Sequence, residues 1–159
     1  MNVPKITLAT ALPPVANARG IRLVGAPQQG TGIDGTSLAN GPILDVAGAN
    51  VSIEGLRIRN CKSSGIVLRA GNFKLHTTTL EACDVGIDVA ENVQQVLIER
   101  NRFSNNRVGV RFTASNRNAL VVKNEFSGNR DAGLWAVRSE PDQRGASIGV
   151  RDNRFNKER

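Results

Sequence analysis

A repeat of about 23 residues constrains the fold of this chain more than any other feature of its sequence. The segment 98–112 reads IERNRFSNNRVGVRF, and the segment 121–135 repeats the pattern as VVKNEFSGNRDAGLW. Each copy has an apolar residue, then an Asn and a Phe two positions apart, then a second Asn, then a Gly that opens a short apolar alternation. Because such repeats are structural units that stack on their neighbours, the chain should fold as a solenoid.

Within one repeat the apolar residues recur at a spacing of two, as at Val96 and Ile98. This spacing places alternate side chains on one face of a β-strand. Three such pairs and three turns in each repeat predict a triangular coil that stacks on the next by parallel pairing. We therefore predict an all-β solenoid of about six coils, with three short strands per coil, over residues 20–159.

The first 40 residues are less regular. We expect residues 1–19 to form a separate N-terminal segment that acts as an opening strand or a cap. Leu23 and Val46 lie one repeat apart, which predicts that the first full coil starts near Gly20, and residues 31–35 resemble a turn. No amphipathic helix precedes the coils, so the strand edges of the end coils need another cover. A longer parent chain, or end-to-end association of two copies, would provide it.

Aligned repeats sort the side chains into columns. The tight turn after the second strand holds Asn101, Asn124 and Asn153, whose amides can bond the coils above and below. In a repeat protein such an inward amide ladder is part of the scaffold and not a ligand site. A neighbouring, mainly aromatic interior column consists of Ile58, Leu80, Phe103, Phe126 and Phe155.

The two cysteines, Cys61 and Cys83, lie one coil apart. Neighbouring strands are about 4.8 Å apart, which a disulfide tolerates. Directly stacked side chains point the same way, however, so we favour two buried free thiols over a disulfide. The only histidine is His76, predicted at the surface beside the tight turn. No metal-ligand spacing is present, and we predict neither a metal nor a cofactor.

The iterated pattern N-x-F, then Asn, then Gly-[Ile/Val]-x-[Val/Phe], over about residues 20–156, resembles the right-handed parallel β-helix of pectate-lyase-like proteins. The resemblance implies a right-handed, single-stranded parallel β-helix and a location outside the cell or on its surface. It is unspecific for function, because the fold hosts lyases, hydrolases, epimerases, phage tailspikes and non-enzymatic surface proteins. The start of the chain lacks the pattern of a signal peptide. No apolar run is long enough to predict a transmembrane segment.

In this family the usual ligand groove lies outside the strand that begins at the repeat glycine. We expect a carbohydrate-binding site there, in which an outward Trp stacks on a sugar ring while charged groups bind hydroxyls or carboxylates. The alternative is that the loop 138–145 covers this Trp. The candidate binding residues are Arg69, Asp88, Arg111, Arg130 and Trp135.

The net charge of +7 arises entirely from residues 100–159, because residues 1–99 hold equal numbers of acidic and basic side chains. This asymmetry favours a polyanionic partner such as an acidic polysaccharide; the alternative is that the charge only maintains solubility. The chain has no tyrosine. It also has no aromatic-rich strand of the kind that binds single-stranded nucleic acid, so we predict no specific nucleic-acid partner.

Catalysis has weaker support than binding. Asp45 and Asp88 share the expected groove, but two coils separate them by roughly 9.6 Å, too far to share a calcium ion. Val67 lies between them. Two functions remain open: a non-catalytic β-helix module that binds carbohydrate or acts as a scaffold, and the core of a polysaccharide lyase or glycoside hydrolase.

Overall fold

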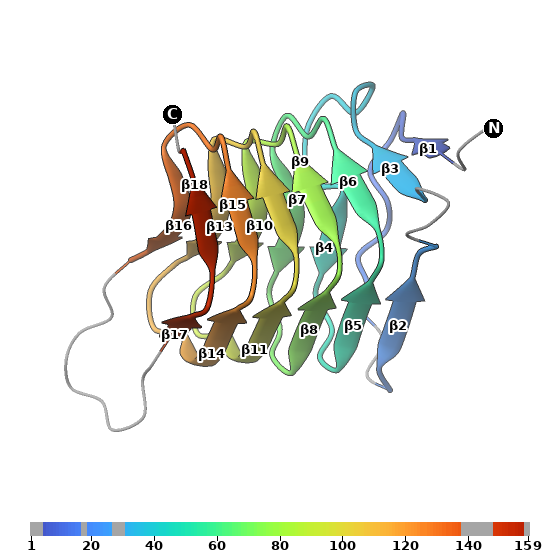
Figure 1. Cartoon of the computed structure of the whole chain (residues 1–159). Helices are drawn as coiled ribbons and strands as arrows, with labels where there is room; N and C mark the ends of the chain where they lie inside the picture. Colours follow the sequence, from blue (N-terminus) through green and yellow to red (C-terminus); the bar gives the residue numbers. More distant parts are fainter. Residues whose placement is uncertain (1–4, 17–18, 27–30, 138–147, 158–159) are drawn as a thin grey trace.

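The chain folds into an all-β parallel solenoid, seen in a computed structural model that describes residues 5–16, 19–26, 31–137 and 148–157. Three parallel sheets of seven, five and six strands run along the solenoid, and each coil from β2 to β16 contributes one strand to each sheet. Figure 1 shows the coils stacked in chain order from the blue N-terminal end to the red C-terminal end. The predicted fold class, with three short strands per coil and about six coils, is confirmed.

The strands are short, with turns between them. The seven-stranded sheet consists of β1 (Lys5–Thr7), β3 (Gly32–Asp34), β6 (Arg57–Arg59), β9 (Thr79–Glu81), β12 (Arg102–Ser104), β15 (Glu125–Ser127) and β18 (Arg154–Asn156). The five-stranded sheet consists of β4 (Leu44–Val46), β7 (Ser64–Leu68), β10 (Val85–Val89), β13 (Val108–Phe112) and β16 (Ala132–Ala136). The six-stranded sheet consists of β2 (Ile21–Val24), β5 (Val51–Glu54), β8 (Phe73–His76), β11 (Gln94–Glu99), β14 (Arg117–Val122) and β17 (Ile148–Arg151).

The interior columns predicted from the repeat are confirmed by the strand register. Phe103 is paired with Leu80 on one side and with Phe126 on the other, and Phe126 is paired with Phe155. The ring centroids of Phe103 and Phe126 are 5.1 Å apart, and those of Phe126 and Phe155 are 4.8 Å apart. Because these rings repeat at the coil spacing, the core continues from one coil to the next.

The predicted amide ladder is also confirmed. Asn124 Oδ1 accepts hydrogen bonds from the Asn101 backbone N–H, at 2.9 Å, and from Asn101 Nδ2, at 3.1 Å. Asn124 Nδ2 donates to the Ile98 carbonyl oxygen at 2.9 Å, and Asn153 Oδ1 continues the ladder into the next coil. A second ladder, not predicted from the sequence, joins Asn106 to Asn129 at the other turn of the seven-stranded sheet. Both ladders bond backbone groups that the core would otherwise leave unpaired.

The predicted register of the first coil is wrong. Leu23 is paired with Ile53, whereas Val46 is paired with Leu68. The connection from β3 to β4 is longer than the equivalent connection from β6 to β7, and it buries Leu38. This first coil is therefore longer than the repeat. The segment 31–35, expected as a turn, contains strand β3 instead. The expected opening strand is present as β1, paired with β3.

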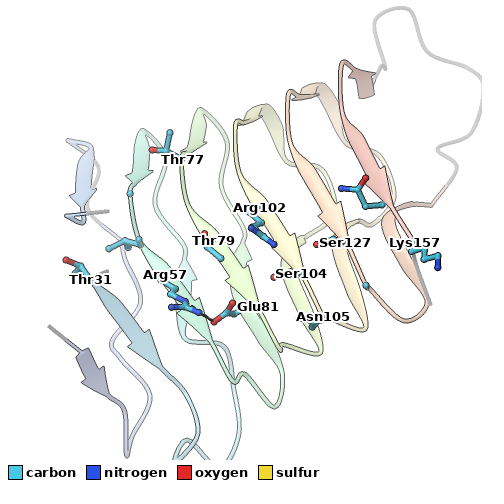
Figure 2. Close-up of a pocket in the computed structure, with 14 residues that line it drawn as sticks. Thr31, Arg57, Thr77, Thr79, Glu81, Arg102, Ser104, Asn105, Ser127 and Lys157 are labelled. Carbon is cyan, nitrogen blue, oxygen red and sulfur yellow. Dashed lines mark hydrogen bonds and ion pairs between the residues drawn. The ribbon is translucent and has the colours of Figure 1, made fainter. Parts of the chain in front are cut away.

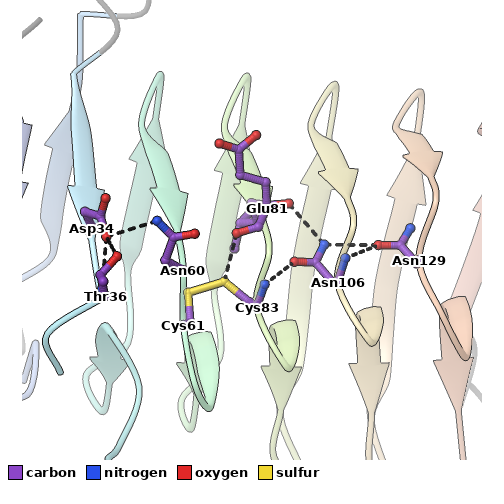
Figure 3. The surroundings of a disulfide bond; sticks show 9 residues. Asp34, Thr36, Asn60, Cys61, Glu81, Cys83, Asn106 and Asn129 are labelled. Carbon is purple, nitrogen blue, oxygen red and sulfur yellow. Dashed lines mark hydrogen bonds between the residues drawn. A yellow bond between two sulfur atoms is a disulfide. The ribbon is translucent and has the colours of Figure 1, made fainter. Parts of the chain in front are cut away.

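The expectation of two free thiols is also wrong, because Cys61 and Cys83 form a disulfide. Their Cα atoms are only 4.2 Å apart, so the sulfurs meet although the side chains stack in the same direction. Both residues are buried in the column that Asn106 and Asn129 occupy in later coils (Figure 3). The disulfide thus replaces part of an amide ladder with a covalent link between two coils.

Breaking this link should lower the free energy of unfolding by about 3 kcal/mol, because the disulfide restricts the unfolded chain. Chemical denaturation of the oxidised protein and of a Cys61→Ala/Cys83→Ala variant measures the difference. A Cys61→Ala/Cys83→Asn variant should recover about 1 kcal/mol, since an amide at position 83 extends the ladder formed by Asn106 and Asn129. Equal stability of the oxidised protein and the alanine variant would contradict the structural role of the disulfide.

Candidate functional site

The outer face of the five-stranded sheet carries most of the predicted binding residues. Asp88, Arg111 and Trp135 lie side by side on β10, β13 and β16. Arg111 Nε donates to Asp88 Oδ1 at 2.9 Å, and this hydrogen bond raises the pKa of Arg111. Arg69 lies apart from this group and donates to Asp45 Oδ1 at 2.8 Å. The structure therefore brings three predicted residues together and places Arg69 in a separate ion pair.

The turn that precedes this sheet holds a chain of ion pairs. Arg107 Nε lies 2.6 Å from Asp84 Oδ1, and Arg107 Nη1 lies 3.0 Å from Asp131 Oδ2. Arg130, the remaining predicted arginine, lies 3.1 Å from Asp131 Oδ1. The hydrogen bond from Arg107 lowers the pKa of both Asp84 and Asp131. Each predicted arginine on this side of the molecule thus has a carboxylate partner.

Trp135 is 48% exposed at the edge of the five-stranded sheet. The loop 138–145, the alternative cover for its ring, lies outside the described residues. The carbohydrate-binding role assigned from the sequence to Trp135 and to four charged residues stays a prediction. Those residues are Arg69, Asp88, Arg111 and Arg130. Any charged ligand on this face would have to compete with ion pairs that already exist.

A hollow of about 1010 Å³ lies over a different face, the outer side of the seven-stranded sheet. Figure 2 shows its lining side chains on strands β6, β9, β12, β15 and β18 and on the turns beside them. None of its 14 lining residues is aromatic. The polar lining comprises Thr31, Arg57, Thr77, Thr79, Glu81, Arg102, Ser104, Asn105, Ser127, Asn156 and Lys157. The hydroxyl and guanidinium groups of this lining can form hydrogen bonds with a polar ligand.

The two halves of this hollow differ in charge. Arg57 donates through Nε to Glu81 Oε1 at 2.8 Å, so the half nearer the N-terminus is close to neutral. Arg102 and Lys157 form no ion pair with any residue that the structure describes. The half nearer the C-terminus therefore offers positive charge to a ligand.

A second hollow of about 420 Å³ follows the tight turn between the six-stranded and seven-stranded sheets. It shares Thr77, Thr79 and Arg102 with the first, so the two hollows form one continuous surface. We call this surface the basic groove, and its cationic residues beyond the Arg57–Glu81 pair are Arg100, Arg102, Lys123, Arg154 and Lys157. Glu125 and Asp152 lie in the second hollow, and Arg100 lies 3.8 Å from Glu99.

The basic groove is the functional feature that sequence reasoning missed. The repeat correctly placed Arg57, Thr79 and Arg102 in one outward column. It did not show which arginines have carboxylate partners, because those partners sit in other columns. The sequence signal available was the excess of basic residues after position 100, and several of these residues line the groove.

A metal centre has no support in the part of the chain that the structure describes, where no cluster of three or more His, Cys, Asp or Glu side chains is suitably placed. Among the same residues, no helix is long and apolar enough to span a membrane.

The chain belongs to a known structural family. The family model described as the right handed beta helix region matches residues 19–156, nearly the whole chain. The predicted right-handed parallel β-helix is thereby confirmed. Searches of the curated proteins and of the solved structures gave no match. Membership in this family defines the fold and leaves the ligand open.

Proposed function

We propose that this chain is a non-catalytic β-helix module that binds an acidic polysaccharide in the basic groove. The observation that supports the proposal is Arg102, an exposed cation in both hollows with no ion-pair partner among the described residues. Thr79, Ser104 and Asn105 line the same hollow, and their hydroxyl and amide groups suit sugar hydroxyls. Charge and hydrogen-bonding capacity thus coincide on one face.

A nucleic-acid ligand fits this groove less well. Single-stranded nucleic acids bind largely by stacking bases on aromatic side chains, and the lining of neither hollow contains an aromatic residue. An acidic polysaccharide needs no such stacking when cations and hydroxyl groups hold it.

The core of a polysaccharide lyase or glycoside hydrolase remains the alternative. A general acid of a glycosidase needs a carboxyl group with a raised pKa. On the five-stranded face the hydrogen bond from Arg107 instead lowers the pKa of Asp84. In the basic groove, Glu81 is paired with Arg57. Incubation with acidic polysaccharides tests the alternative, because new unsaturated or reducing ends would establish an enzyme.

A location outside the cell or at its surface is part of the proposal. It is supported by the Cys61–Cys83 disulfide, since disulfides persist mainly in oxidising compartments.

End-to-end contact between copies also remains a proposal. The exposed large apolar side chains of the described residues lie in the first and last coils, as Ile6 and Phe155 illustrate. The basic last coils of two copies would repel each other electrostatically, so the N-terminal end is the favoured contact.

Binding to heparin or a polyuronate should fall steeply as salt is added, because each neutralised charge releases counterions. Titration calorimetry at low and moderate salt measures this dependence. An Arg102→Gln/Arg154→Gln variant should lose about tenfold or more in affinity, since charge-assisted contacts are the strong ones. Arg130→Gln, at a residue that lines neither hollow, is the control and should bind like the natural chain. If neither heparin nor the polyuronate binds at low salt, the proposal is wrong and the positive charge serves only solubility.

A further inference from the structure

The outward column along the basic groove alternates in charge from coil to coil. Its successive residues, paired in register, are Arg57, Thr79, Arg102, Glu125 and Arg154. Every second coil therefore presents an arginine. With about 4.8 Å between neighbouring coils, successive arginines are separated by roughly 9.6 Å along the solenoid.

The positions between the arginines are neutral or acidic. Thr79 separates Arg57 from Arg102, and Glu125 separates Arg102 from Arg154. Asn156 Nδ2 donates to Glu125 Oε1 at 3.3 Å, so this carboxylate is held in the C-terminal part of the groove. Neither Arg102 nor Arg154 has a carboxylate within ion-pairing distance among the described residues. Arg154 Nε donates to Asn156 Oδ1 at 3.0 Å. Two cations without a carboxylate partner thus flank one held anion.

This arrangement has a direct consequence for a linear anionic ligand. A chain with a negative charge on every unit would place one charge beside Glu125, and like charges brought together in a binding site weaken binding. A chain with a charge on every second unit would meet Arg102 and Arg154 and present a neutral unit to Glu125. A nucleic-acid strand carries a phosphate on every nucleotide, so it too would place a negative charge beside Glu125.

We propose that the basic groove selects acidic polysaccharides in which charged and neutral sugar units alternate. This inference rests on the proposed function. One sugar unit is about as long as one coil is high, so a charged unit lies at Arg102, a neutral unit at Glu125 and the next charged unit at Arg154. The Arg57–Glu81 pair, which is close to neutral, leaves the N-terminal half of the groove to hydroxyl contacts.

The test compares two ligands of equal length by titration calorimetry at low salt. Oligosaccharides of hyaluronan alternate a uronate with a neutral amino sugar, whereas oligogalacturonate carries a carboxylate on every unit. The natural chain should bind the hyaluronan oligosaccharide about tenfold more tightly despite its lower charge. Glu125→Gln should raise the affinity for oligogalacturonate about tenfold and change hyaluronan binding much less, because it removes the like charge.

Glu91→Gln is the control for the change in net charge, since Glu91 is exposed in the turn between β10 and β11. Lys123, on the tight turn of the Glu125 coil, is retained in every variant. If both ligands bind equally tightly, and Glu125→Gln changes their affinities no more than Glu91→Gln does, the proposed selectivity for alternating charge is wrong. The proposed function would remain intact. Failure of both ligands to bind would overturn the proposed function as well. Tighter binding of a single-stranded oligonucleotide than of either sugar would overturn the choice of polysaccharide.

Discussion

Replacement of Phe126 by alanine should lower the free energy of unfolding by about 3–5 kcal/mol, as expected for loss of a fully buried aromatic side chain. Phe126 is inaccessible to solvent and is stacked between Phe103 and Phe155. Parallel coils cannot close the resulting cavity without giving up their hydrogen-bonded register. Urea or guanidinium denaturation, followed by circular dichroism, measures the change.

Phe155→Ala is the matched control. It removes the same side chain from the same column, one coil further along, where the ring is 50% exposed. Its cost should be about 1–2 kcal/mol, because less apolar surface leaves water at this position on folding. Equal losses for the two variants would show that Phe155 is buried in solution and that the end of the column is covered.

Replacement of Asn124 by leucine should lower the free energy of unfolding by about 4 kcal/mol. The two side chains have the same number and branching of heavy atoms, so most of the effect comes from lost hydrogen bonds. The Asn101 N–H and the Ile98 carbonyl oxygen would both remain buried without their partner. Each buried unsatisfied group costs about 1–3 kcal/mol. The same denaturation experiment measures the loss.

Asn153→Leu tests whether position in the ladder matters. Asn153 is only partly buried, so water can reach the groups that its amide would leave unpaired. We expect a loss of about 1–2 kcal/mol for this variant. If Asn124→Leu is no worse than Asn153→Leu, the interior ladder does not stabilise the coils as described.

The repeat made most of the fold predictable. A spacing of two within strands and about 23 between coils determines which side chains stack, so columns such as the one through Phe103 and Phe126 followed directly. The register of the first coil could not be predicted in this way. Its β3–β4 connection is longer than in later coils, and the Asn and Phe residues that mark the later repeats are absent there. The Cys61–Cys83 disulfide was missed because the common direction of stacked side chains was taken to keep the sulfurs apart, whereas Cα atoms 4.2 Å apart let them meet.

The candidate site was less predictable than the fold. The repeat placed Asp88, Arg111 and Trp135 together, but it could not show that Arg111 is bound to Asp88. Long side chains reach diagonally between columns, as Arg69 does to Asp45 and Arg57 does to Glu81. Which cations remain available to a ligand depends on these diagonal contacts, and they determine the character of the basic groove.

The most direct test of the proposed function is the location of the ligand on the molecule. Backbone amide shifts of the isotope-labelled chain, measured by NMR during titration with a hyaluronan oligosaccharide, give that location. The largest shifts should fall on Arg102, Ser104 and Ser127, with the five-stranded face nearly unchanged. Largest shifts instead at Asp88, Arg111 and Trp135 would contradict the basic groove as the binding site and restore the face predicted from the sequence.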